Sequence, residues 1–190
     1  NILVGTPPFR GRYRDEISKR FFEEHALDDR KLIYRKDQEE LDKISNPSFF
    51  DQYNAKRALN FFDPKNKKGE DIWQKTNLDE DLIKKYFSLI DDFDIKQEKV
   101  KFVVPTFLAL GKEDYVCPYI LWNLQDDKPQ DTEHPQDTEH KKEDKEDFVM
   151  LKAPFLEAHV FEKSAHFSMI EEESAFMYEL VGFLEKRKLF

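Results

Sequence analysis

The stretch Val104–Pro118, VPTFLALGKEDYVCP, gives the clearest structural signal in the chain. It continues an apolar run from Val100 to Leu110, which is typical of a strand buried on both faces of a parallel sheet. Gly111 ends this run, and two acids, Glu113 and Asp114, follow almost at once. Such a position is either an ordinary turn or a site where one of the acids works at the edge of the sheet.

Two further strands are predicted, one at each end of the chain. Leu156–Glu162 alternates like a strand and leads through the loop Lys163–Phe167 to an amphipathic helix, Glu171–Glu185. The first strand is the short apolar run Ile2–Val4, which a glycine and two prolines stop. Because buried strands alternate with helices, the sequence predicts an α/β fold with a helical block inserted after the first strand.

Residues 10–98 are predicted to be almost wholly helical. The expected helices are Asp15–His25, a weaker one at Asp37–Ile44, one from Phe49 to Leu59 with Ser48 as a cap, and Asp79–Leu89. The apolar face expected for the last of these is formed by Leu82, Ile83, Tyr86, Phe87 and Ile90. A short helix is also expected at Pro118–Leu124, and Met177 and Val181 are expected on the core side of the C-terminal helix.

Residues 125–147 contain the repeat PQDTEH at 129–134 and again at 135–140, followed by KKEDKED. The tract has no residues that could form a core, so it is predicted to be an exposed low-complexity insertion. A metal site built from His134 and His140 with nearby acids is the less favoured interpretation.

Composition narrows the classes of function. The net charge of −9 argues against a nucleic-acid partner, and no apolar run is long enough to span a membrane. One cysteine, Cys117, excludes an internal disulfide, and the acidic balance is compatible with a cytoplasmic protein. The N-terminus does not have the pattern of a signal peptide, and we expect the chain to start inside a strand of a larger protein. No motif indicates a cofactor or a metal.

Two stretches at predicted strand ends suggest chemistry. Gly111-Lys112-Glu113-Asp114 follows the central strand, and Ser164-Ala165-His166-Phe167, with Glu171 a few residues on, follows the last one. A carboxylate that orients an imidazole, which in turn activates a nucleophile, is the arrangement of a hydrolytic triad. Taken separately, each residue is more often structural, as a turn acid or a packed histidine.

VPTFLALGKEDYVCP followed by FEKSAHFSMIEEESAFMYELVGFL resembles the C-terminal end of the α/β-hydrolase superfamily. NILVGTPP at 1–8 resembles the sixth strand of that family, and proline iminopeptidase-like members are the nearest. The resemblance implies that Asp114 is the triad acid and His166 the triad base. It also implies a partial hydrolase core at 1–9 and 99–190, a helical cap at 10–98, and an insertion into the core at 125–147.

The sequence departs from the family at the nucleophile, which normally sits in G-x-S-x-G. Glycine occurs only at positions 5, 11, 69, 111 and 182, none of which forms that motif, and the oxyanion loop is also missing. The sequence therefore predicts the C-terminal part of a serine hydrolase that cleaves an ester, amide or peptide. Its partners would be a small-molecule or peptide substrate and the missing N-terminal half of the fold, and the chain alone would be inactive.

The alternative is a hydrolase-like remnant or binding module without catalysis. A nucleophilic role for Cys117 is not expected, because nothing places it on an elbow. Arg10, Arg12 and Arg14 are interpreted as a solvated charge run, and His159 as a half-buried surface residue. Trp73 and Phe61-Phe62 either line a substrate pocket or form the core of the cap itself.

Overall fold

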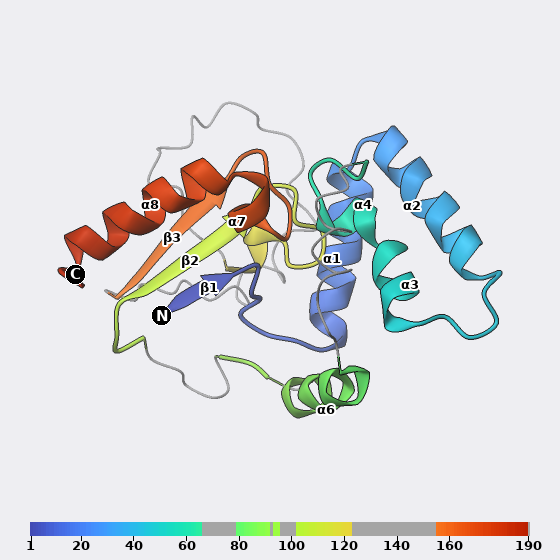
Figure 1. Cartoon of the computed structure of the whole chain (residues 1–190), viewed down its shortest axis with the longest axis horizontal. Coiled ribbons are helices and arrows are strands. Elements are labelled where there is room, and N and C mark those ends of the chain that lie inside the picture. The colour runs from blue at the N-terminus through green and yellow to red at the C-terminus, as the bar shows by residue number, and fades with distance from the viewer. Residues whose placement is uncertain (66–78, 92, 96–101, 123–154, 190) are drawn as a thin grey trace, which may run out of the picture.

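The computed structural model describes residues 1–65, 79–91, 93–95, 102–122 and 155–189. Three strands, β1 (Ile2–Val4), β2 (Thr106–Gly111) and β3 (Leu156–Phe161), form a parallel sheet in the order β1-β2-β3. In Figure 1 the strands point toward the helices α1 to α4, which lie beyond their carboxyl ends, while α8 runs along the sheet. This is the mixed α/β fold that the sequence predicted, with the parallel strands expected of a partial α/β-hydrolase.

The central strand is buried along its whole length, because β2 has a neighbour on both edges and side chains packed on both faces. It begins at Thr106, later than the Val100 start that the apolar run predicted. Val103 is 70% exposed, and Pro105 has no N–H to donate to a neighbouring strand. The apolar run therefore begins before the strand does, because an apolar side chain does not by itself place the backbone in a hydrogen-bonded ladder.

One face of the sheet packs against the C-terminal helix. The cluster is formed by Phe107, Ala109, Phe161, Phe176, Leu180 and Phe183. The helix predicted at 171–185 is α8 (Glu173–Lys186), which begins two residues later because Glu172 has a non-helical backbone, and a short helix, α7 (Ser168–Glu171), precedes it. The prediction that Met177 and Val181 belong to the core side was wrong, since they are 49% and 37% exposed.

The other face of the sheet is covered by Ile95 and by the 3₁₀-helix η1 (Tyr119–Trp122), which is the short helix predicted at Pro118–Leu124 as far as the described residues extend. Trp122 packs on Leu108 and Leu110, and its indole N–H donates to the carbonyl of Thr6 at 2.7 Å. Both faces of β2 are thus closed by aromatic side chains, which bury a large area each.

Between β1 and β2 the described residues form the helices α1 (Arg12–His25), α2 (Asp28–Leu41), α3 (Phe49–Asn54), α4 (Arg57–Asn60) and α6 (Glu80–Ile90). The helix predicted at 37–44 is α2, which begins nine residues earlier, at Asp28. The prediction missed this start because a buried residue there, Arg30, is charged, and a search for apolar periodicity does not detect it. The helix predicted from Phe49 to Leu59 is two helices, interrupted at residues 55–56.

The helix ends follow ordinary capping chemistry. Ser48 caps α3, as the sequence predicted, and forms a capping box with Asp51, while the Asp79 side chain caps α6. Of the apolar face predicted for α6, Leu82, Tyr86 and Phe87 are exposed, and the Arg10 guanidinium lies over the Phe87 ring. Trp73 and the repeat tract at 125–147 lie outside the described residues.

Candidate active site

The carboxyl ends of β2 and β3 bring Asp114 and His166 together. Asp114 Oδ2 lies 2.9 Å from His166 Nδ1, within hydrogen-bonding distance, as the sequence predicted for two consecutive strand ends. Asp114 is fully buried, whereas the His166 side chain is 24% exposed. One ring edge is therefore held by a buried carboxylate while the ring stays accessible.

The second oxygen of Asp114 is held by the backbone of its own loop. Oδ1 accepts hydrogen bonds from the N–H groups of Val116 at 2.9 Å and Cys117 at 2.7 Å. These bonds hold the carboxylate in place and leave Oδ2 directed at the histidine. The two interpretations of this loop, an ordinary turn and a site for chemistry, are compatible, because the Asp114 carboxylate both accepts from the backbone of the turn and contacts His166.

Burial alone would lower the pKa of His166, but the charge and the hydrogen bond of Asp114 oppose this and the net shift is upward. The pair therefore favours a protonated ring. When Nδ1–H donates to Asp114, the lone pair lies on Nε2, and no described residue hydrogen-bonds Nε2. A histidine in this state can accept a proton at Nε2 and keep it stabilised.

A glycine at the end of the first strand makes room for the ring. Gly5 has φ +55°, and a Cβ built on it would lie 2.9 Å from His166 Nδ1 and 2.8 Å from the His166 carbonyl oxygen. Gly111 plays a similar part between the loops, since its Cβ would lie 1.9 Å from the carbonyl oxygen of Ala165. Sequence reasoning treated both only as strand ends.

The helical region touches both loops of the pair. Phe61 is buried and stacks on Phe167, with ring centroids 5.3 Å apart. The N–H of His166 donates to the carbonyl of Asn60 at 3.0 Å. Phe61 thus packs on the loop of His166, which lies outside residues 10–98, and not in a core formed by the helical region alone.

Arg14 was interpreted as part of a solvated charge run, and this was wrong. Its side chain is only 17% exposed, and its charge acts on both Cys117 and His166. Glu113, by contrast, pairs with Arg30 at 3.0 Å, away from the ring. His159 is half-buried on β3 beside Glu179 at 3.4 Å, in the kind of position predicted for it.

Cys117 is the third polar side chain beside the pair. Burial raises the pKa of its thiol far above the usual range, and Asp114 raises it further, so the thiol is protonated at neutral pH and is a poor nucleophile. Donor atoms of Asp114, Cys117 and His166 lie within 4.8 Å of one another, which is a spacing that a metal ion could bridge. Such an ion would need the thiolate, would have to open the Asp114–His166 bond, and would meet the charge of Arg14.

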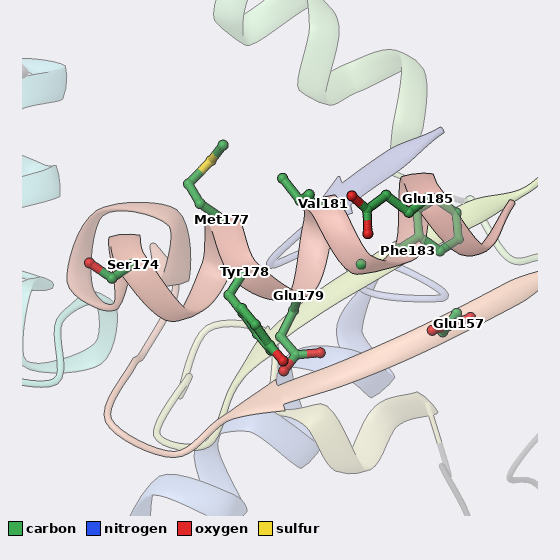
Figure 2. Close-up of a pocket in the computed structure, with 9 residues that line it drawn as sticks. Glu157, Ser174, Met177, Tyr178, Glu179, Val181, Phe183 and Glu185 are labelled. Atoms are coloured by element: carbon green, nitrogen blue, oxygen red, sulfur yellow. The ribbon is translucent and has the colours of Figure 1, made fainter. Parts of the chain in front are cut away.

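A hollow in the described surface lies elsewhere. Figure 2 shows the residues that line it, which include Met177, Tyr178 and Glu179 of α8 and Glu157 of β3. Neither Asp114 nor His166 contributes to it. This hollow is therefore separate from the candidate site.

Comparison with known proteins supports the fold and leaves the family open. No family model and no curated protein matches the chain. A solved structure of a thermophilic esterase is similar to it, with 19% sequence identity, a TM-score of 0.52 and coverage of 97% of this chain. The match covers 55% of the esterase, so the chain spans about half the length of that protein.

The likeness to the esterase is compatible with an α/β-hydrolase-type fold and gives no support to the proline iminopeptidase-like resemblance. Among the described residues, no helix is both long and apolar enough to cross a bilayer.

Proposed function

We propose that this chain carries the acid and the base of a serine hydrolase of the α/β-hydrolase type, with Asp114 as the acid and His166 as the base. The 2.9 Å bond between them, at the carboxyl ends of adjacent parallel strands, is the observation that supports this most directly. Open α/β sheets place their chemistry at this edge. An ester is the favoured substrate class, because the similar solved structure is an esterase.

In this proposal His166 acts through Nε2. It accepts the proton of a nucleophilic hydroxyl as that oxygen attacks the substrate carbonyl, and it returns the proton to the leaving group. Asp114 keeps the ring oriented through Nδ1 and stabilises the cationic ring during the transfer. Residues 10–98 would act as a lid over this edge of the sheet.

The nucleophile and the oxyanion donors would come from a segment that this sequence does not contain. The outer edge of β1 has no partner strand among the described residues, and Ile2 there is half exposed. A strand from the missing half would pair at that edge and carry the nucleophile elbow beside the two loops. The substrate would be a small molecule or a peptide, and the acidic composition supports a cytoplasmic location.

The test is to read the coding sequence upstream of residue 1, join the encoded segment to this chain, and measure hydrolysis of an activated ester and labelling by a fluorophosphonate. We expect labelling of an upstream serine that Asp114→Asn slows and His166→Ala abolishes. The isolated chain should show neither reaction, since removing the nucleophile and the oxyanion donors removes nearly all of the acceleration.

An upstream segment without G-x-S-x-G, or a joined protein whose ester hydrolysis is unchanged by His166→Ala, would overturn the proposal. Either result would favour the alternative, a hydrolase-like module that binds without catalysis.

A further inference from the structure

A short segment of the helical region, residues 58–62, lies between the loops of Asp114 and His166; we call it the strap. We propose that Arg30 and Glu171 are positioning residues that fasten the strap to these two loops, so that the helical region sets the geometry of the Asp114–His166 pair. The inference rests on the proposed function only where it concerns catalysis. The effect of Arg30 and Glu171 on the Asp114–His166 pair can be measured without a substrate.

The strap contacts both loops through its backbone. The carbonyl of Leu59 accepts from the N–H of Tyr115, the residue after Asp114, at 3.3 Å. The next carbonyl, that of Asn60, accepts from the N–H of His166 at 3.0 Å. Two successive peptide groups of the strap thus bridge the acid loop and the base loop.

Arg30 of α2 holds the strap from the side of the acid loop. Its guanidinium donates to the carbonyls of Ala58 at 3.0 Å and Phe61 at 2.7 Å, and also to that of Phe62. The same group pairs with Glu113 at 3.0 Å, directly beside Asp114 in the chain. A buried cation is tolerated only when it is paired and hydrogen-bonded, and Arg30, 7% exposed, satisfies this by joining the strap to the acid loop.

Glu171 of α7 holds the strap from the side of the base loop. Oε1 accepts from the N–H of Phe62 and Oε2 from the N–H of Ala165, both at 2.7 Å. Ala165 directly precedes His166, so one carboxylate joins the end of the strap to the peptide that carries the base. Burial raises the pKa of Glu171 to about 7, although these two hydrogen bonds and Arg30 oppose the rise.

Neither side chain hydrogen-bonds the Asp114 carboxylate or the His166 ring. Their effect on the pair can therefore pass only through the strap and the loops, or through space as charge. These two routes predict opposite results for Arg30. Loss of a cation can only raise the affinity of a nearby imidazole for protons, whereas loosening the Asp114 contact lowers it.

The test is the titration of the His166 ring in this chain, followed by NMR. In Arg30→Met we expect the pKa of His166 to fall by about half a unit or more, against the sign of the lost charge. Glu171→Asp keeps an ionisable carboxyl group but is too short to reach both N–H groups, and we expect a fall of similar size. Arg30→Lys, which keeps the charge and part of the donor set, should fall less than Arg30→Met.

Glu172→Asp is the matched control. Glu172 is the adjacent carboxylate and holds the same loop, through the N–H of Lys163 and the hydroxyl of Ser164, and its side-chain hydrogen bonds go to this loop and not to the strap. We expect its titration of His166 to resemble that of the unchanged chain. An equal fall in Glu172→Asp and Glu171→Asp would show that the loop alone matters and would overturn the role of the strap.

An unchanged pKa of His166 in both Arg30→Met and Glu171→Asp, with native near-ultraviolet circular dichroism, would overturn the proposal. If Arg30→Met does not fold, Glu171→Asp decides the matter. A fall in the pKa of His166 in the variants of this chain, together with a joined protein that hydrolyses no ester, would keep the positioning role and refute the proposed function, so the two failures are distinguishable.

Discussion

Gly5 lies directly against the ring of His166: a Cβ built on it would come within 2.9 Å of Nδ1, the nitrogen that faces Asp114. Real Cβ atoms do not approach other atoms this closely, and Gly5 also has a positive φ of +55°. The end of β1 thus shapes the pair although it supplies no functional group. Three neighbouring strands each contribute to one small site.

Gly5→Ala should therefore move the histidine. We expect it to destabilise the chain by about 1–3 kcal/mol, through steric overlap and the positive φ, and to lower the pKa of His166. Gly182→Ala is the control, because nothing lies within 4 Å of its added Cβ in α8, and it should be neutral or stabilising by about 0.5–1 kcal/mol. Denaturant unfolding measures both, and equal stabilities would contradict the packing described at Gly5.

Asp114→Asn should lower the pKa of His166, because the charge that raises it is lost while the side chain keeps its shape. The amide oxygen can still accept from the N–H groups of Val116 and Cys117, so the loop should stay folded. NMR titration of the ring measures the shift. The ring signals of His159, which faces Glu179, should be the same in both proteins and serve as an internal control. A titration of His166 that does not change would mean that the two side chains are not coupled in solution.

Stability should fall as the pH rises from 5 to 8. The pKa of Glu171 is raised from 4.5 to about 7, and that of His166 is raised from 6.5. A group whose pKa is higher in the folded state contributes stability below its unfolded pKa, and this contribution is lost as the pH rises through the folded value. Glu171→Gln, a neutral side chain of the same shape, should flatten the curve. Unfolding free energies at several pH values test this, and a rise in stability across the interval would contradict it.

Phe183→Ala should be far more damaging than Met177→Ala. Phe183 packs its ring against Phe107 of β2, with centroids 5.5 Å apart, and we expect a loss of about 3–5 kcal/mol. Met177 lies on the exposed side of the same helix, and its loss should cost about 0.5 kcal/mol or less. If Phe183→Ala does not fold, Phe183→Leu provides a milder comparison. Equal costs at the two positions would show that α8 is rotated relative to the sheet.

Local patterns were sufficient for much of the fold. The apolar run before Gly111 and the alternation after residue 155 identified β2 and β3, because side-chain burial on a strand is visible in the order of residues. The cap at Ser48 was predicted for a similar reason, because the break at Asn46-Pro47-Ser48 is a local signal; its capping box with Asp51 was found only in the structure. The start of α2 was missed because Arg30 is buried although it is charged, and a search for apolar periodicity counts a charged residue as exposed.

The sequence by itself determined that Glu113, Asp114 and His166 stand at strand ends, and its resemblance to the α/β-hydrolases selected Asp114 and His166 among them. Only the tertiary structure decided what surrounds them. Nothing local separates Glu171 from its two acidic neighbours, yet it alone accepts from the N–H of Phe62, a residue 109 positions away. Gly5 likewise meets His166 only once three strands have aligned. Such contacts depend on how loops that are distant in the sequence pack together. The role of the buried carboxylate of Glu171 and of the space left by Gly5 therefore cannot be inferred from the residues next to them in the chain.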